Sequence, residues 1–255
     1  KLFLAAEIKS IAKLSKSLFE RLMILSETHK SVLIPGYTHF QIGMPSSFGL
    51  WFSAFAESLS EDLEVLAAAL SVVQKNPLGS GAGFGSSFPL DRDFTTKELN
   101  LEKMNVNSVY AQMTRGKSEK ITAMAMSTLA STLGKLAYDI CMFSNQNYGF
   151  IGFPTELTTG SSIMPHKKNP DVFELIRAKS ARIQSLPNEL TLLTNNLPSG
   201  YHRDFQLTKK IIFPGIQELK DCLEIFEFML QHIEVKNDIL KDEKYDYLFS
   251  VEKIN

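Results

Sequence analysis

Apolar residues recur along this chain at alternating spacings of three and four, the period of an α-helix that buries one face. Five runs follow this pattern, the first with one polar interruption at Ser15: Leu4, Ile8, Ile11, Ser15, Leu18, Leu22 and Leu25; Phe48, Phe52, Phe55, Leu59, Leu63, Leu66, Leu70 and Val73; Leu129, Leu133, Leu136, Ile140 and Phe143; Ile183, Leu186, Leu190, Leu193 and Leu197; Ile212, Ile216, Leu219, Leu223, Phe226, Leu230 and Ile233. They predict five helices of roughly 25 to 40 residues, well above the ~11 to 12 typical of globular domains. Helices of that length pack side by side, so the predicted fold class is all-α, a long-helix bundle.

Several of these helices also carry apolar residues away from their main stripe: Leu14, Trp51, Met124, Met126 and Phe228. Such residues are often simply part of the core. Here they indicate that more than one face of a helix needs covering, which favours an oligomer whose subunits share one helical bundle.

Three segments interrupt the helical pattern, at residues 32 to 47, 76 to 100 and about 149 to 170. Pro214 lies inside the fifth run and predicts a kink, because proline removes one backbone hydrogen bond. Nothing marks a domain boundary before residue 238 or so. We therefore expect a central helical-bundle domain over 1–237 and the start of a truncated C-terminal helical domain over 238–255. The chain opens and closes in mid-pattern, which predicts that it is part of something longer.

The composition excludes several classes of protein. Lys and Arg total 27 against 28 Asp and Glu, a net charge of −1, which argues against a nucleic-acid or membrane-surface partner held by the global charge. Cys141 and Cys222 lie in apolar helical patterns without metal-ligand spacing, so we expect them to be reduced, buried and inert. No stretch reaches membrane-spanning length and no signal segment is evident, so a cytoplasmic location is the default expectation.

The segment with the clearest chemistry runs from Gly160 to Asp171 and reads GSSIMPHKKNPD. Hydroxyls, two amines and an amide precede an Asn-Pro-Asp that is typical of a helix start. Free N–H groups and the helix dipole there would reinforce Lys167 and Lys168 in holding a carboxylate or phosphate. The alternative is ordinary capping and turn chemistry beside a solvated lysine pair.

Other polar residues occur in the breaks or at helix starts. His39 lies in GYTHFQ, Glu174 falls one turn into the helix after the signature loop, and Tyr201, Gln206 and Lys209 follow a Pro-Ser-Gly break. Taken singly, each fits a surface or satisfied buried side chain. Their joint occurrence is what indicates a site.

The order of these motifs resembles that of the argininosuccinate lyase family in the fumarase and aspartase superfamily, whose members eliminate across a C–N or C–O bond to release fumarate. The resemblance covers about Pro35 to Lys209. It rests on the segments PGYTHFQ, NPLGSGAGFGSSFPLDRDFTTKEL, NSVYAQ, TTGSSIMPHKKNPDVFELIRAKS and LPSGYHRDFQ.

The resemblance implies catalytic roles for four residues. Ser161 would be the general base, with Lys167 and loop N–H groups stabilising its alkoxide. His39, paired with Glu174, would deliver a proton to the leaving guanidinium. Charge that builds on the substrate carboxylate would be held by fixed cations and N–H donors.

Substrate binding is implied for five more residues: Thr38, Asn169, Tyr201, Gln206 and Lys209. Asn169 would share the fumarate carboxylates with Lys167, Thr38 would contact substrate beside His39, and the other three would bind the remainder of the substrate. The partner implied is the small molecule argininosuccinate. No metal and no organic cofactor is implied, and the glycine-rich loop at 79 to 85 lacks the Gly-Lys-Ser/Thr ending of a phosphate cradle.

The sequence also departs from the family. It reads MTRGK after NSVYAQ, where many members carry Asp-Arg-Asp, and His166 stands where Gln is common. The family's Ser-Arg-Asn-Asp segment lies outside this chain, so we expect the chain alone to be inactive. Family members are tetramers that build each active site from three subunits, which implies a homotetramer here.

The leading hypothesis is therefore a lyase that converts argininosuccinate to arginine and fumarate in arginine biosynthesis. One alternative keeps the elimination but changes the substrate to adenylosuccinate, aspartate or a modified argininosuccinate. Another is a non-catalytic helical scaffold that retains the fold. Gly160 and the hydroxyl run further predict that the loop at 149–170 moves during turnover.

Overall fold

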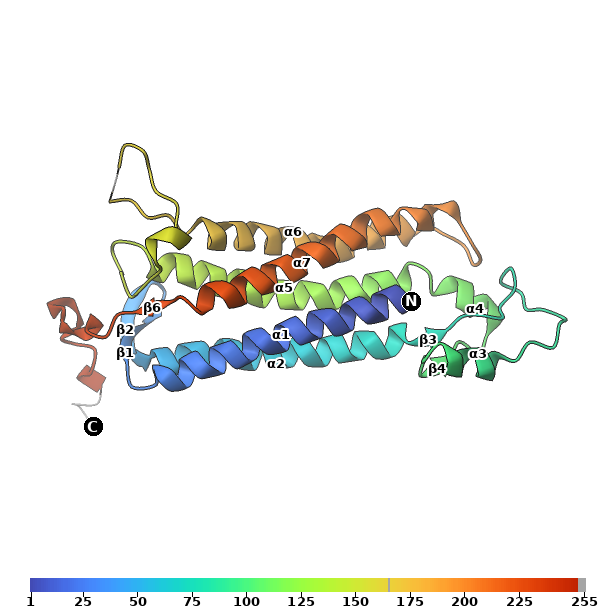
Figure 1. The fold of residues 1–255 in the computed structure, drawn as a ribbon, viewed down its shortest axis with the longest axis horizontal. Coiled ribbons are helices and arrows are strands. Elements are labelled where there is room, and N and C mark those ends of the chain that lie inside the picture. Colours follow the sequence, from blue (N-terminus) through green and yellow to red (C-terminus); the bar gives the residue numbers. More distant parts are fainter. Residues whose placement is uncertain (165, 252–255) are drawn as a thin grey trace. The chain divides into compact units, whose positions relative to one another are not determined.

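The computed structural model describes residues 1–164 and 166–251. Within them, long helices confirm the fold class predicted from the apolar spacing (Figure 1): α1 (Leu2–Thr28), α2 (Phe48–Val73), α5 (Lys117–Phe143), α6 (Asp171–Thr194) and α7 (Thr208–Leu230). Helices α6 and α7, with 24 and 23 residues, are slightly shorter than predicted. Helix α6 ends before Leu197 because that residue precedes Pro198, and a residue before proline disfavours helical geometry.

The chain forms two compact units, and each long helix contributes to both. Unit 1 consists of Lys1–Leu14, Glu61–Ser131 and Lys179–Cys222, and unit 2 of Ser15–Ser60, Thr132–Ala178 and Leu223–Asn255. The described part of the segment from 238 onward lies in unit 2, where it forms two short 3-10 turns, η3 (Ile239–Lys241) and η4 (Glu243–Tyr245). A separate domain beginning at residue 238 stays a prediction.

In unit 1 the predicted helix stripes form the core. The buried side chains include Leu4, Ile8, Ile11, Leu66, Val73, Met126, Leu129, Ile183, Leu186, Ile212 and Leu219. Helices α6 and α7 approach closely at Gly215, where a Cβ atom would lie 2.3 Å from Leu186 Cδ1. Proline lies inside both helices, at Pro187 and Pro214, so each lacks a backbone hydrogen bond there. The kink at Pro214 stays a prediction.

The core of unit 2 is rich in aromatic rings. Buried members include Phe48, Phe52, Phe150, Phe173 and Phe226, together with Leu18, Leu22, Leu133, Leu136 and Ile140. Trp51 packs beside Phe143 with ring centroids 5.1 Å apart, and its indole N–H donates to Asp139 Oδ2 at 3.1 Å. Burial raises the pKa of the Asp139 carboxyl, and the indole donor and Lys135 oppose that shift.

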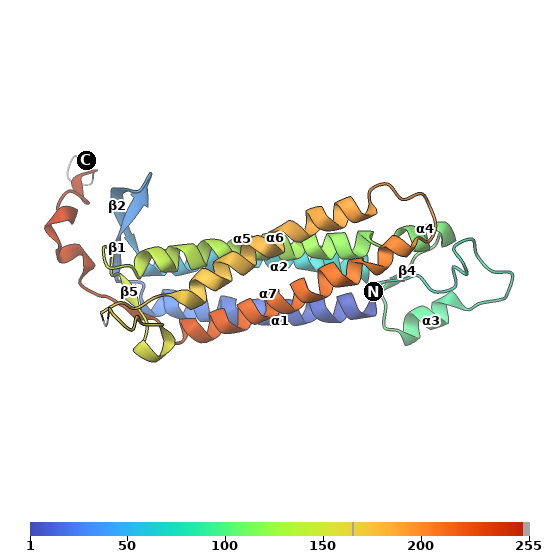
Figure 2. The ribbon, with the colours of Figure 1, turned by 90° about the horizontal axis from the view of Figure 1, so that it is seen from above.

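The breaks between the long helices hold short elements that the helical pattern did not predict. Three strand pairs form among the described residues: the antiparallel hairpin β1 (Leu33–Thr38) with β2 (Gln41–Ser47), the parallel pair β3 (Lys75–Asn76) with β4 (Lys103–Met104), and the antiparallel pair β5 (Ile151–Gly152) with β6 (Glu234–Val235). The short helical elements are α3 (Arg92–Glu98), α4 (Ser108–Met113) and the 3-10 turns η1 (Thr155–Leu157) and η2 (Arg203–Gln206). Figure 2 shows the hairpin projecting from the end of its helices.

The residues away from the main stripes differ in their exposure. Met126 is fully buried and belongs to the core, whereas Met124 and Phe228 are 51% and 43% exposed. Cys222 is buried, as predicted, but Cys141 is only half-buried. In the described part of the chain, none of the helices combines the length and apolar character needed to span a membrane.

Candidate active site

The first break carries Thr38 and His39 at the tip of the β1–β2 hairpin. Thr38 pairs with Gln41, so His39 and Phe40 form the two-residue turn. Their φ angles are 55° and 58°, in the left-handed region that such hairpin turns require. Because neither residue is glycine, this conformation costs about 1–2 kcal/mol per residue. Both Thr38 and His39 expose their side chains there.

The glycine of PGYTHFQ has a steric function in this hairpin. The strand register shifts between Pro35 and Tyr37, which places a bulge in β2, where Gly43 and Met44 both face Gly36. A Cβ atom at Gly36 would lie 2.9 Å from the Met44 carbonyl oxygen. Any larger residue would force the two strands apart and move the tip.

The signature loop is closed at its base by backbone pairing. The Asn169 N–H donates to the Thr159 carbonyl at 2.8 Å, and the Thr159 N–H donates back at 3.4 Å. The Thr159 hydroxyl also donates to Asp171 at the start of α6. Ser161 follows this base and is partly buried, and its hydroxyl accepts from the Ile163 N–H at 3.4 Å. Pro165 lies outside the described residues.

The basic side of the loop faces an open depression in unit 2. Lys167, Lys168 and Asn169 line it together with Cys141 from the last turn of α5 and Asn145 from the loop after it, and its volume is about 470 Å³. With two ammonium groups and an amide, this surface can bind a small carboxylate or another anion. Burial raises the pKa of the Cys141 thiol, so Cys141 is a weak nucleophile here.

Glu174 lies in the first turn of α6 and is exposed, as is His39. Among the described residues of this chain, no hydrogen bond or ion pair joins His39 to Glu174. The pairing implied by the family resemblance is thus not made within this chain, and it stays a prediction for residues of neighbouring subunits.

The remaining predicted site residues belong to unit 1. Gln206 donates to the Tyr201 hydroxyl at 2.6 Å, which ties the two ends of the YHRDFQ segment together. The guanidinium of Arg115, in the TRG segment before α5, lies 4.8 Å from the centre of the Tyr201 ring and 5.8 Å from that of Phe205. A cation over a ring face is stabilising, so Arg115 helps to orient Tyr201.

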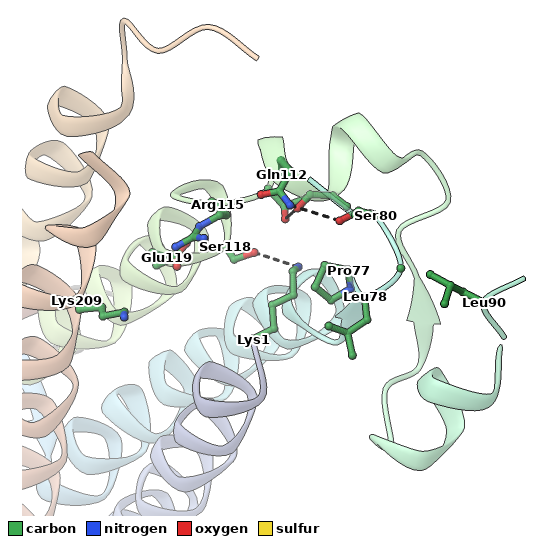
Figure 3. A pocket seen from close by; sticks show the side chains of 14 residues that line it. Lys1, Pro77, Leu78, Ser80, Leu90, Gln112, Arg115, Ser118, Glu119 and Lys209 are labelled. Carbon is green, nitrogen blue, oxygen red and sulfur yellow. Dashed lines mark hydrogen bonds between the residues drawn. The ribbon is translucent and has the colours of Figure 1, made fainter. Parts of the chain in front are cut away.

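Lys209 and Arg115 also line the same cavity of unit 1, which has a volume of about 650 Å³ (Figure 3). Gln112 donates to the Ser80 hydroxyl at 3.4 Å across this cavity. Glu119 supplies a carboxylate at the same lining, so the cavity can receive a ligand that carries both a cationic and an anionic group.

The glycine-rich loop that walls this cavity is held by two side chains. Arg92 donates to the carbonyl oxygens of Leu78, Asn105 and Val106, at 2.8, 2.6 and 3.2 Å. Asn76, fully buried, binds the hydroxyls of Thr95 and Thr96 through its side-chain amide. The wall is therefore fixed by hydrogen bonds to side chains of α3.

Three residues with a role in this cavity were not predicted from the sequence: Gln112, Arg115 and Glu119. Arg115 was noted only as part of the MTRGK departure from the family, and Gln112 only as part of NSVYAQ. The available signal for Arg115 was its place beside Gly116, which has a φ of 78° and is followed directly by α5.

The predicted residues thus form two groups. Unit 2 contains Thr38, His39, Ser161, Lys167, Asn169 and Glu174, and unit 1 contains Tyr201, Gln206 and Lys209.

Several solved structures have a similar fold. EDDS lyase in complex with formate matches with a TM-score of 0.87 and 20% identity, covering 97% of this chain and 48% of that one. Class II fumarase from Schistosoma mansoni matches with a TM-score of 0.86 and 19% identity, covering 98% and 57%. At these identities the similarity establishes the fold alone.

Relatives found by sequence have a higher identity to this chain than these solved structures do. Argininosuccinate lyase from Bacteroides fragilis (strain YCH46) is 56% identical over all 255 residues. The chain spans 57% of that relative's length. The family model described as Lyase matches residues 1–185, a range that includes the His39 hairpin and the signature loop, and this chain therefore belongs to that lyase family.

Proposed function

We propose that the protein containing this chain is an argininosuccinate lyase, which eliminates fumarate from argininosuccinate to leave arginine. The observation that carries the proposal is the 56% identity over all 255 residues of the chain to an argininosuccinate lyase. As an enzyme of amino-acid biosynthesis, it would act in the cytoplasm.

The chemistry assigns Ser161 as the base that removes a proton next to a carboxylate. A serine hydroxyl requires help to ionise, and Lys167 with the loop N–H groups is the source of that help. The same groups hold the carboxylate on which charge then builds. The depression lined by Lys167, Lys168 and Asn169 supports this assignment because it concentrates positive charge beside the loop.

His39 is assigned as the proton donor to the departing guanidinium, with Glu174 as its partner from another subunit. The amine half of the substrate would lie at Tyr201, Gln206 and Lys209. The cavity lined by Lys209, Arg115 and Glu119 suits a molecule with amino-acid and guanidinium groups.

A homotetramer with shared active sites follows from the same proposal. The supporting observations are that His39 and Glu174 do not meet within the chain, and that apolar side chains such as Leu50, Leu175 and Leu192 are exposed on long helices. Mixing inactive Ser161→Ala and His39→Asn proteins tests the sharing. Reassembled mixed tetramers should regain part of the activity, whereas unshared sites would leave the mixture inactive.

Fumarate release by the full-length protein tests the reaction. Ser161→Ala should lower kcat by about 10²- to 10⁴-fold, the usual contribution of a positioned base. Ser185→Ala removes an exposed serine of α6 and is the matched control, with kcat expected near that of the natural protein. Undiminished turnover by Ser161→Ala would eliminate the serine as base.

Competition between substrates tests which amine is joined to fumarate in the natural substrate. Argininosuccinate should be consumed in preference to adenylosuccinate or aspartate when all three are supplied together. Preference for another of these adducts would keep the elimination chemistry but replace the substrate, and binding without any turnover would identify a non-catalytic scaffold.

A further inference from the structure

The hairpin tip that carries His39 needs an anchor outside itself. His39 and Phe40 both hold positive φ angles that L side chains rarely adopt, so the surroundings must maintain this turn. Phe40 is 67% exposed and cannot fix the tip by its own packing. The anchor has to come from the strand that leads into the turn.

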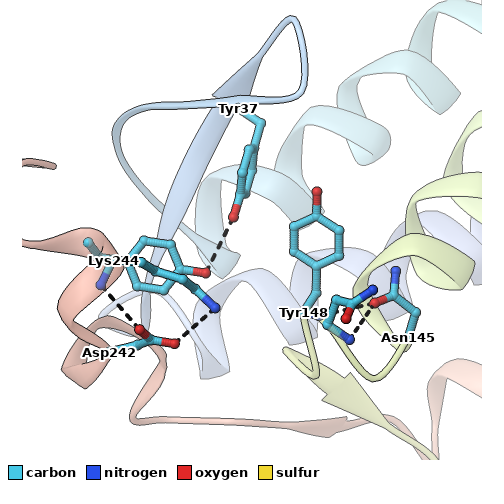
Figure 4. Close-up of polar contacts among 7 residues, drawn as sticks. Tyr37, Asn145, Tyr148, Asp242 and Lys244 are labelled. Atoms are coloured by element: carbon cyan, nitrogen blue, oxygen red, sulfur yellow. Dashed lines mark hydrogen bonds and ion pairs between the residues drawn. The ribbon is translucent and has the colours of Figure 1, made fainter.

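Tyr37, two residues before His39 in β1, makes that contact. Its hydroxyl lies 3.3 Å from the Tyr245 hydroxyl, and its ring meets the Tyr148 ring edge-on with centroids 5.3 Å apart (Figure 4). These three tyrosines come from the hairpin, the loop after α5 and the turn η4, all within unit 2. They form a cluster that we call the tyrosine triad.

The two partners of Tyr37 are themselves held in place. Tyr245 is 4% exposed, and Asp242 fixes its turn by accepting from the Lys244 N–H at 3.1 Å and pairing with Lys244 Nζ at 2.9 Å. The Asn145 side chain accepts from the Tyr148 N–H at 3.0 Å. Figure 4 shows these contacts on both sides of the Tyr37 ring.

The segment that carries Tyr245 is also attached to the start of the signature loop region. Strand β6 pairs with β5, and the Lys236 N–H donates to the Phe150 carbonyl at 3.0 Å. One stretch of chain, residues 234 to 245, therefore contacts both the His39 hairpin and the entry to the loop that bears Ser161.

We propose that Tyr245 is a positioning residue for the reaction, acting through its hydroxyl contact with Tyr37 to hold the His39 turn. This inference rests on the proposed function, because it takes His39 as the proton donor. Both phenols are neutral at physiological pH, since burial raises the pKa of each further above its ordinary value near 10, so the hydroxyl contact persists there. A misplaced donor slows proton transfer but leaves substrate contacts at the signature loop intact.

Tyr245→Phe and Tyr37→Phe test the inference in the full-length protein, since each removes one oxygen and keeps the ring. Each should lower kcat roughly 3- to 10-fold, the range for one lost hydrogen bond, with KM within about twofold. The double variant should be no slower than either single variant, because both remove the same contact. Tyr247→Phe, at a tyrosine that is 85% exposed, is the matched control and should leave kcat unchanged.

Hydrogen exchange separates failure of this inference from failure of the proposed function. Amide exchange in residues 33 to 47 should be several-fold faster in Tyr245→Phe than in Tyr247→Phe, whether or not argininosuccinate is the substrate. Equal exchange in the two variants would overturn the link. Losses in kcat that multiply in the double variant would also overturn it, because they would show two independent roles.

Discussion

The guanidinium of Arg115 lies over the ring of Tyr201, 4.8 Å from its centre, while the Tyr201 hydroxyl accepts a hydrogen bond from Gln206. One face and the polar end of this ring are thereby oriented by side chains from two separate segments. The ring belongs to the group that the proposed function assigns to the amine half of the substrate.

Arg115→Ala should therefore raise KM for argininosuccinate by about 3- to 30-fold, in keeping with ~0.5–2 kcal/mol for a cation over a ring. Steady-state kinetics of the full-length protein measure this. Arg182→Ala is the control, because Arg182 is an exposed arginine of unit 1 whose guanidinium forms a surface ion pair with Glu218. An unchanged KM in Arg115→Ala would show that the stacked cation plays no part in binding.

Gly79→Ala should destabilise the glycine-rich loop. Gly79 has a φ of 84°, and a Cβ atom there would lie 2.8 Å from Arg92 Cγ. Arg92 cannot move aside without losing its three carbonyl contacts, so we expect the free energy of unfolding to fall by about 2–4 kcal/mol. Urea denaturation measures the change.

Gly149→Ala is the matched control for that substitution. Gly149 also has a positive φ, of 57°, but nothing lies within 4 Å of a Cβ atom there. It should show only the backbone cost of about 1 kcal/mol. Equal effects of the two substitutions would mean that the Arg92 clash is relieved without cost.

Trp51→Phe should destabilise unit 2 in a pH-dependent way. Burial raises the pKa of Asp139 above its ordinary value near 4, so its favourable contribution is present at low pH and is lost as pH rises through the folded-state pKa. Removing the indole donor raises that pKa further. The loss of stability should thus be about 1–3 kcal/mol at pH 7 and smaller near pH 4, because the raised pKa increases the protonated fraction of Asp139 as pH falls.

Urea denaturation at the two pH values isolates this effect, because the smaller ring costs the same packing energy at both. When Asp139→Asn is present in both proteins compared, Trp51→Phe should cost the same free energy of unfolding at pH 4 and at pH 7. A loss of equal size at pH 4 and pH 7 would contradict the assigned role of the hydrogen bond.

Alkaline pH should destabilise the tyrosine triad. Burial raises the pKa of Tyr37 in the folded protein, so the stabilising contribution of the neutral phenol is complete below its unfolded pKa near 10 and is lost as pH rises above that value. Urea midpoints should fall as pH rises above about 10. The fall should be shallower in Tyr37→Phe, while Tyr247→Phe should keep the slope of the natural protein.

The sequence predicted the long helices well because their signal is local. The apolar stripe of α2 runs from Phe48 to Val73, and the helix has those bounds. It predicted the first turn of α6 equally well, since Asn-Pro-Asp is a local start signal and Asp171 is the first residue of the helix. It placed two helix ends too late, because the apolar runs continue to Leu197 and Ile233 whereas α6 ends at Thr194 and α7 at Leu230.

The hairpin at His39 could not be predicted in the same way. Its turn contains none of the Gly or Asn residues that normally mark a two-residue turn, and the strained conformation is maintained by Tyr37 against Tyr148 and Tyr245. Likewise, the position of Arg115 over Tyr201 depends on segments that are remote in the sequence.

By itself, then, the sequence determined the helical architecture and the chemical inventory of the signature loop, because helix periodicity and residue chemistry are properties of neighbours along the chain. Only the tertiary structure decided which of these side chains contact one another. It brings Arg115 onto Tyr201 and Tyr37 to Tyr245. Within the part of the chain that the structure describes, His39 and Glu174 share no hydrogen bond or ion pair. The physical reason is that such pairs depend on the close packing of distant segments, which local pattern does not encode.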